Sequence, residues 1–240
     1  MNKKSIIIAV VIVVLLIFIS GAVETNKPES SGEYFTFTDS EGEIVELSHK
    51  PQKTAVLFSS LAECWIEAGG EVYVTVGESV ERGLVKEETE LVDKGAGKTV
   101  DTEKLISLEP DFVICSADIA SHRDVASALK KAKIPVAMLR MDTFEDYLTI
   151  LRTLTKITGK TENYEQFGEN AKSEIEQIIS GGKRENNPKI LFVRSGSSYS
   201  SAKAKKADDN FAAKILEDFG CVNIADKAET LLDNLSAEVI

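Results

Sequence analysis

The sequence predicts an α/β fold of two parallel-sheet lobes bridged by a long helix, with the second lobe incomplete. Three observations support this fold class. Solid apolar runs, which are typical of strands in a buried parallel sheet, alternate with helical patterns between residues 54 and 141. Two helical stretches then interrupt this alternation, and strand and helix patterns resume after Asn186-Asn187-Pro188. The composition, with 43% hydrophobic and 28% charged residues, is that of a globular protein.

The first lobe, which we expect over residues 34–142, is predicted element by element from its periodicity. Period-two alternation indicates a hairpin, Gly69-Gly70 closes one helix and Pro110 stops another. The expected order is a hairpin of strands 34–39 and 43–47, strand 54–60, helix 61–70, strand 71–79, a polar loop to about Val100, helix 101–109, strand 111–116, helix 121–133 and strand 134–141.

The bridging segment, expected over residues 143–182, consists of two helical patterns. The first, 144–158, ends at Gly159, and the second, 161–180, ends at Gly181-Gly182. Twenty helical residues extend about 30 Å, the width of a small domain. The second helix is therefore long enough to connect two lobes.

The second lobe, expected over residues 183–240, repeats the pattern of the first with strand 189–195, helix 210–220 and strand 221–226. Asp101-Thr102-Glu103 at the start of one helix matches Ser236-Ala237-Glu238, because each has a cap, one residue and then a glutamate in the first turn. The helix body, the proline and the buried strand that follow the first copy are missing after the second. We therefore expect the chain to be a fragment or the product of an interrupted gene.

The N-terminal residues predict export. Lys3 and Lys4 precede an apolar run from Ile6 to Ile19, which is shorter than the roughly 20 residues that a membrane-spanning helix needs. We expect a signal peptide over residues 1–22 and a flexible tether over residues 23–33, with a short cytoplasmic anchor as the alternative.

A lipid anchor is not expected from the residues around the cleavage site. Ile19-Ser20-Gly21 resembles the start of a bacterial lipobox, but Ala22 stands where the lipid-bearing cysteine would be. The mature chain is therefore either released or held by an uncleaved leader.

The charge and the cysteines exclude several classes of partner and site. A net charge of −11 disfavours nucleic acids and anionic lipids, so we expect membrane contact only through the leader or a membrane partner. Cys64, Cys115 and Cys221 are widely separated and lie in apolar patterns, which predicts core residues rather than disulfides. No cofactor is expected.

Catalytic and metal-binding motifs are sparse. Ser200 and Lys203 match the SxxK pair of penicillin-recognising enzymes, but they lie in a Ser- and Lys-rich loop without companion motifs. His49 and His122 are the only histidines, and neither has a partner at metal-ligand spacing. We expect His49 in a turn and His122 at a helix start, capping or at the surface, with a ligand contact as the alternative for His122.

A binding cleft is predicted where the strands end, because ligands of open α/β sheets bind outside the carboxyl ends of the strands. Two such edges that face each other would suit a bulky, partly anionic ligand. The residues expected there are Ser59, Ser60, Glu78, Arg82, Ser116, Asp118, Met141, Asp142, Arg194, Ser195 and Ser197.

Several motifs together resemble the solute-binding proteins of ABC importers for iron-siderophore complexes, cobalamin and haem. The most specific is the run from Glu103 to Ile114, EKLISLEPDFVI. Supporting motifs are Asp39-Ser40-Glu41-Gly42, Pro51, Ser59 to Glu63, Gly69-Gly70, Ile134-Pro135-Val136, Thr158-Gly159, Asn223-Ile224-Ala225 and Leu235 to Glu238. The resemblance implies two Rossmann-like lobes joined by a long helix, and a monomeric, non-catalytic protein.

The resemblance also implies how the protein works. An exported protein, at the outer face of the cytoplasmic membrane, the cell surface or the periplasm, would capture such a solute between the lobes and deliver it to a permease. In this family a glutamate on each lobe pairs with arginines of the permease, and the matching positions are Glu103 and Glu238.

Two other functions remain open from the sequence. One is an exported α/β enzyme, either an SxxK hydrolase using Ser200 or a chelatase-like protein using His122. The other is an ectodomain sensor of the same fold. A receptor for bare transition-metal ions is disfavoured, because such sites use several His and carboxylate ligands.

Overall fold

The computed structural model describes residues 34–93, 99–182, 186–194, 202–208 and 210–227. The predicted leader and tether, the helix start at Ser236, and the candidate residues Ala22, Ser195, Ser197, Ser200 and Glu238 lie outside the described residues. Within the described ranges, none of the helices has the length and hydropathy needed to cross a bilayer.

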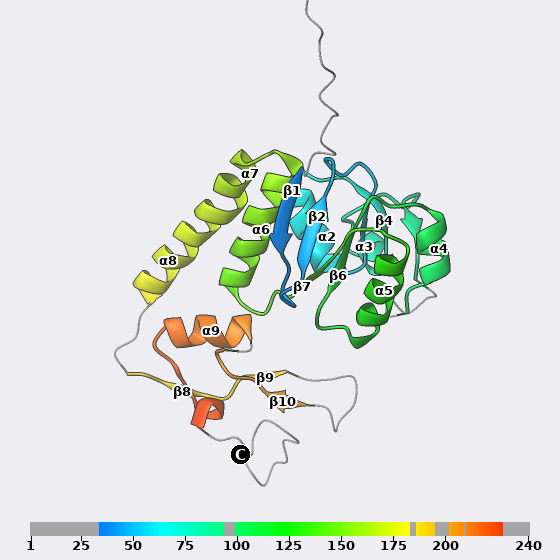
Figure 1. Cartoon of the computed structure of the whole chain (residues 1–240). Helices are drawn as coiled ribbons and strands as arrows, with labels where there is room; N and C mark the ends of the chain where they lie inside the picture. Colours follow the sequence, from blue (N-terminus) through cyan, green and yellow to red (C-terminus); the bar gives the residue numbers. More distant parts are fainter. Residues whose placement is uncertain (1–33, 94–98, 183–185, 195–201, 209, 228–240) are drawn as a thin grey trace, which may run out of the picture. The chain divides into compact units, whose positions relative to one another are not determined.

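A parallel sheet forms the core of the first lobe, as the sequence predicts, and it has five strands (Figure 1). Its strand order is β5-β4-β3-β6-β7, so the chain moves outward from β3 to β5 and then returns to the other side of β3. The order reverses between β3 and β6, where crevices form in such sheets. The strands are β3 (Thr54–Val56), β4 (Val72–Thr75), β5 (Glu90–Leu91), β6 (Phe112–Ser116) and β7 (Val136–Leu139).

Several boundaries in this lobe differ from the expectation. The predicted strand 54–60 ends at Val56, because helix α2 (Ser59–Glu67) begins three residues later. The stretch predicted as a polar loop contains β5, which pairs in parallel with β4 although it has only two residues. The predicted strand 71–79 ends at Thr75, because helix α3 (Gly77–Glu81) begins two residues later. The side chain of Asp93 fixes that helix start by accepting a hydrogen bond from the N–H of Gly77 at 2.8 Å.

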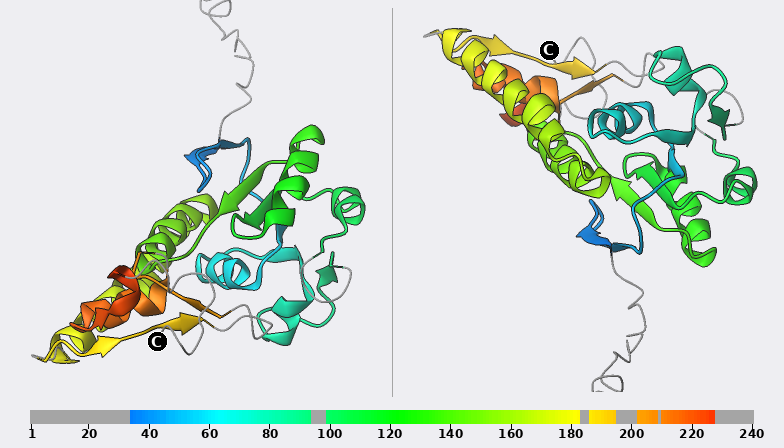
Figure 2. Two further views of the ribbon diagram at one scale, coloured as in Figure 1. Left: turned by 90° about the horizontal axis from the view of Figure 1, so that it is seen from below. Right: turned by 90° about the horizontal axis from the view of Figure 1, so that it is seen from above.

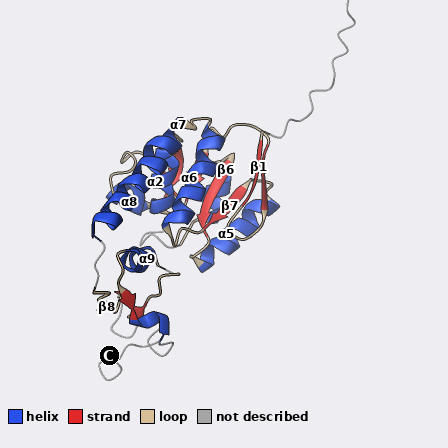
Figure 3. Cartoon of the chain, turned by 90° about the vertical axis from the view of Figure 1, so that its left-hand side faces the viewer, coloured by secondary structure: helices blue, strands red, loops and turns tan. Residues whose placement is uncertain are grey.

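Helices cover both faces of the sheet (Figure 3). Val56 and Ile114 point into a cluster with α2 (Ser59–Glu67) and α6 (Phe144–Thr158), whereas Ala55 and Val113 point into a cluster with α4 (Thr102–Ser107) and α5 (Ala120–Lys131). This alternation is the period of two expected of strands buried on both faces. Cys64 and Cys115 are buried in the two clusters, as predicted.

The hairpin of β1 (Phe35–Thr38) and β2 (Ile44–Leu47) packs on the α2/α6 side of the sheet. Asp39 connects it to β7. One carboxylate oxygen of Asp39 accepts from the N–H groups of Glu41 and Glu43, and the other accepts from the N–H of Met138 at 3.0 Å.

The first bridging helix, α6, has the predicted extent, whereas the second continues through Gly181 and Gly182, which were expected to end it. Thr143 and Asp146 form a capping box at the start of α6, and Gly159, with φ of +72°, ends it. The second helix contains a π-helical turn, η1 (Glu165–Glu169), between α7 (Glu162–Tyr164) and α8 (Asn170–Gly182), which the sequence did not predict. Both views in Figure 2 show α8 leading towards β8.

The C-terminal segment is built from very short strands. They are β8 (Lys189–Ile190), β9 (Val193–Arg194), β10 (Lys203–Ala204) and β11 (Val222–Asn223), with α9 (Phe211–Asp218) and the 3-10 helix η3 (Ile224–Lys227). The predicted strand 189–195 is wrong as one strand, because β8 pairs in parallel with β11 whereas β9 pairs antiparallel with β10. Strand 221–226 also ends early, where the side chain of Asn223 accepts from the N–H of Ala225. Cys221, expected in the core, is only half-buried.

Candidate functional site

A cavity of about 470 Å³ lies at the carboxyl edge of the sheet, at the point where the strand order reverses. The first lobe and the C-terminal segment both line it. Its lining residues are Phe58, Ser60, Leu61, Ser116, Asp118, Leu139, Met141 and Asp142 on the first side, and Arg194, Lys205, Asn210 and Phe211 on the second. The cavity therefore has the location and mixed lining of a small-molecule site.

The structure brings six of the predicted site residues together in this cavity, namely Ser60, Ser116, Asp118, Met141, Asp142 and Arg194. Three others, Ser59, Glu78 and Arg82, do not line it. Glu78 is exposed on α3, and Arg82 is paired with Glu63 at 2.5 Å. Both follow β4, which is separated from β6 by β3.

Arg82 instead supports the wall of the cavity. Its guanidinium donates to Ser59 at 3.1 Å and to Ser60 at 3.4 Å, at the first turn of α2. Ser59 is buried beneath Ser60 and does not line the cavity. Arg82 thus orients a lining residue, while Glu63 neutralises its charge.

Asp118 and Asp142 supply two carboxylates to the same wall. Arg140, which is not among the predicted site residues, lies between them, with Nε 2.9 Å from Asp118 and 3.9 Å from Asp142. Burial raises the pKa of Asp142, and the neighbouring carboxylate of Asp118 raises it further, whereas Arg140 and Lys205 lower it. Arg140 is the first residue after β7 and directly precedes Met141, so its place at the strand end was a signal in the sequence.

The opposite wall contains Lys205, Asn210 and Phe211, which sequence reasoning also missed. Asn210 caps α9 by accepting from the N–H groups of Ala212 and Ala213 at 3.1 and 3.3 Å. The Phe211 ring meets that of Phe144 edge to face at 6.1 Å. The Asn cap before an apolar helix was a readable signal for Asn210, but nothing in the local pattern indicates that Lys205 faces the sheet.

His122 lies beneath the cavity, and the surface position expected for it is wrong. The side chain is only 1% exposed, and its Nδ1 accepts from the backbone N–H of Ser116 at 3.0 Å. Burial lowers the pKa of His122, which favours the neutral ring that this hydrogen bond requires. Ser116 in turn accepts from the N–H of Asp118 at 3.2 Å, so His122 holds the loop that carries both residues.

The remaining predicted residues lie elsewhere. His49 is exposed, with its Nε2 3.4 Å from Asp111. Glu103 is exposed in the first turn of α4, where Asp101 caps the helix by accepting from the N–H of Lys104. Across the described ranges, no group of three His, Cys, Asp or Glu side chains is arranged to hold a metal ion.

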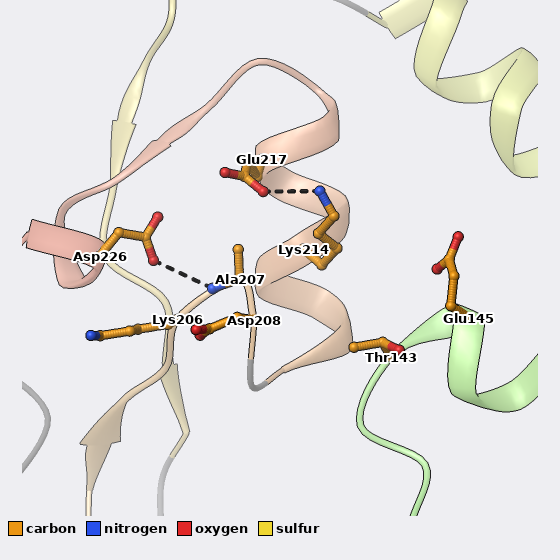
Figure 4. Close-up of a pocket in the computed structure, with 8 residues that line it drawn as sticks. All are labelled: Thr143, Glu145, Lys206, Ala207, Asp208, Lys214, Glu217 and Asp226. Atoms are coloured by element: carbon orange, nitrogen blue, oxygen red, sulfur yellow. Dashed lines mark hydrogen bonds and ion pairs between the residues drawn. The ribbon is translucent and has the colours of Figure 1, made fainter.

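A second cavity, of about 580 Å³, lies between the start of α6 and α9 (Figure 4). Its charged side chains are mostly satisfied by the protein itself. Lys214 pairs with Glu217 at 3.0 Å and with Asp218 at 2.9 Å, and Asp226 accepts from the N–H of Ala207 at 3.4 Å. This cavity is larger but is not at the carboxyl edge of the five-stranded sheet, so we take the cavity at that edge as the candidate site.

Comparison with known proteins identifies the fold. The family model described as periplasmic binding protein matches residues 54–240. No curated protein sequence matches the chain. The structure resembles the siderophore binding protein BauB in complex with acinetobactin and ferric iron, with a TM-score of 0.65, 16% identity, and coverage of 86% of this chain and 72% of BauB.

Two further solved structures are similar. The heme binding protein HmuT gives a TM-score of 0.63 at 20% identity, covering 85% of this chain and 67% of HmuT. An ABC transporter substrate-binding protein from Listeria monocytogenes EGD-e gives 0.62 at 14% identity, covering 79% and 70%. The chain spans 64% of holo-ViuP, another similar structure. At these identities the likeness shows the fold, and the family match over residues 54–240 means that this chain belongs to the periplasmic binding proteins, a family of binding proteins rather than enzymes.

Proposed function

We propose that this protein is the exported solute-binding component of an ABC importer, and that it holds a bulky metal chelate of the iron-siderophore, haem or cobalamin class. The observation that supports this most is the cavity at the carboxyl edge of the sheet, which is lined from two sides. Family membership supports a location outside the cytoplasmic membrane. In this proposal residues 34–142 form one lobe, 143–182 the bridge and 183–240 part of a second lobe.

Ligand capture is tested by titrating the full chain with a ferric siderophore, haem and cobalamin, followed by absorbance and native mass spectrometry. A Ser60→Trp variant should lose binding, because the indole would occupy the cavity next to Leu61. Ser107→Trp, on the exposed face of α4, serves as the control. If a folded Ser60→Trp protein bound these ligands with full affinity, the cavity would not be their binding site.

Delivery to the permease is the second part of the proposal, with Glu103 and Glu238 as the docking contacts. A docking carboxylate on each lobe would fix the orientation of the complex through ion pairs that also speed the encounter. Reversing both charges with lysine should reduce uptake in cells without changing ligand affinity. The same change at Glu81, which is exposed on α3, is the control, and unchanged uptake in the double variant would argue against the docking role.

A further inference from the structure

We infer that the cavity at the carboxyl edge selects a bulky chelate without net charge over a strongly anionic one. This inference rests on the proposed function, because it narrows the class of solute that the same cavity takes. The shared chemistry is a neutral metal complex with an oxygen-rich surface. A ferric trihydroxamate and a neutral corrinoid both have it, whereas a ferric tris-catecholate is a trianion.

The charges that line the cavity are balanced. Asp118 and Asp142 are on one wall, and Arg194 and Lys205 are on the other. An anionic chelate that approaches the two cations must also approach the two carboxylates, and like charges brought together at a binding surface oppose association. Among the described lining residues, positive charge therefore does not exceed negative charge, so they offer no net attraction for a trianion.

The two arginines nearest the first wall are already engaged by carboxylates. Arg140 is shared between Asp118 and Asp142, and Arg82 is paired with Glu63. A ligand that recruited either guanidinium would have to separate it from its carboxylate. That exchange replaces one ion pair by another and leaves a carboxylate without its partner.

Asp142 is the residue most sensitive to a further negative charge. Its side chain is 42% exposed, and its ionised form is already disfavoured by burial and by Asp118. A ligand that fills the cavity would exclude water from this wall, and electrostatic repulsion grows as water is removed. A neutral ligand avoids this cost.

The uncharged part of the lining suits a neutral chelate. Phe58, Leu139, Met141 and Phe211 offer apolar contact area, and Ser60 and Asn210 offer short polar groups for ligand oxygens. Burial of apolar ligand surface would then supply most of the affinity. The charged groups would orient the bound chelate and disfavour anionic chelates, rather than attract the ligand.

The test measures the affinity of the full chain by calorimetry for four probes: ferrichrome as a neutral ferric trihydroxamate, cyanocobalamin as a neutral corrinoid, ferric enterobactin as a tris-catecholate, and haem. One of the neutral probes should bind at least about tenfold more tightly than ferric enterobactin, which is a difference of about 1.4 kcal/mol. Haem, with its two propionates, should also bind more weakly than the favoured neutral probe. The better of ferrichrome and cyanocobalamin identifies the source of the neutral chelate.

Substitution of the carboxylates tests the cause of the preference. In Asp142→Asn and Asp118→Asn, the ratio of the neutral probe's affinity to that of ferric enterobactin should fall about tenfold. Asp124→Asn, which removes an exposed carboxylate of α5 outside the cavity, should leave the ratio unchanged. Thermal melts establish that each variant is folded. Raising the salt concentration should bring the ratio of the neutral probe's affinity to that of ferric enterobactin closer to one in the unmodified protein.

The outcomes separate the inference from the proposed function. If ferric enterobactin or haem binds as tightly as the neutral probes, or if the ratio is the same in both carboxylate variants, the cavity does not select by charge, although it still binds a chelate. If none of the four probes binds, the proposed function fails and the inference fails with it.

Discussion

The imidazole of His122 and the backbone N–H of Ser116 form a hydrogen bond inside the first lobe, directly below the candidate site. The bond fixes the end of β6. It forms only while Nδ1 is unprotonated, because only then can this nitrogen accept a hydrogen bond. It therefore couples the charge state of a buried ring to the position of a residue that lines the cavity.

Acid should destabilise the protein in part through His122. Its pKa is lowered in the folded state from the usual 6.5, so the unfolded chain takes up the proton first, and the stability that the neutral ring contributes is lost as pH falls below about 6.5. His122→Asn, which keeps an acceptor near the Ser116 N–H, should lose less stability between pH 7.5 and 5.5 (about two pH units) than the unmodified protein. Melting temperatures at both values test this, and equal losses would exclude His122 as the source.

Gly70 allows close packing of Trp65. A Cβ at residue 70 would overlap the indole, which is only 2% exposed and donates from Nε1 to the carbonyl of Glu71 at 2.9 Å. Gly70→Ala should therefore lower the free energy of unfolding by about 1–3 kcal/mol. Trp65 is the only tryptophan, so its emission reports the change directly. Gly181→Ala, at an open helical position, should be neutral or slightly stabilising, and equal effects at the two positions would refute the overlap.

The hydroxyl of Tyr147 connects α6 to α2 and to the π-helical turn. It lies 3.0 Å from the carboxylate of Glu67 and 3.1 Å from the carbonyl oxygen of Phe167. Tyr147→Phe should cost about 1–3 kcal/mol of stability, because the single hydroxyl proton that lies between these two acceptors is lost in a partly buried place. Tyr73→Phe, which removes one longer hydrogen bond of 3.4 Å to Leu108, should cost less. Denaturant unfolding compares the two variants, and an equal cost would contradict this role for Tyr147.

The ionised carboxylate of Glu67 should destabilise the fold at neutral pH. Burial raises its pKa, and Glu63 adds to the rise, although the hydrogen bond from Tyr147 opposes it. The ionised form is therefore disfavoured in the fold, so the penalty is present above the raised pKa and disappears as pH falls below the ordinary value. Glu67→Gln should raise the melting temperature at neutral pH relative to the unmodified protein, with a difference that shrinks towards about pH 4. If this difference in melting temperature grew as the pH fell, the ionised form of Glu67 would not be the source of the penalty.

Asp39 should be essential for joining the hairpin to β7. Its carboxylate accepts three backbone N–H groups, including that of Met138, and the residue is 8% exposed. An amide cannot replace it, because its NH₂ group would face an N–H. Asp39→Asn should cost about 3 kcal/mol, measured by denaturant unfolding, whereas Asp124→Asn should change stability by less than about 0.5 kcal/mol. A near-neutral Asp39→Asn would mean that water replaces these bonds.

The sequence predicted long elements with local end signals well. The extent of α6 from Phe144 to Thr158 is confirmed, because Gly159 ends it, and α9 (Phe211–Asp218) lies within the predicted helix 210–220. The strands β5 and β8–β11 have only two residues each, which is too short for periodicity to show. Their existence depends on partner strands that are distant in the sequence.

The candidate site could be predicted only in part, because the local sequence indicates where each strand ends but not which strands are neighbours. Residues after β3, β6 and β7 meet in the cavity because those strands are neighbours. Glu78 and Arg82 follow β4, on the far side of β3, and no local pattern reveals the order of strands. Lys205 and Phe211 were missed for a similar reason, since their approach to the sheet is set by tertiary packing.

The π-helical turn η1 sets the rotational phase of the helix that follows it. One additional residue in a helical turn rotates everything beyond it by about 100° relative to an uninterrupted α-helix. Ile175 and Ile179 of α8 share a groove with Ile215 of α9 in the phase that η1 produces. Loss of a single residue from Glu165–Glu169 would turn this apolar stripe away from α9, so the number of residues in that turn, rather than their identity, determines how the bridge meets the C-terminal segment.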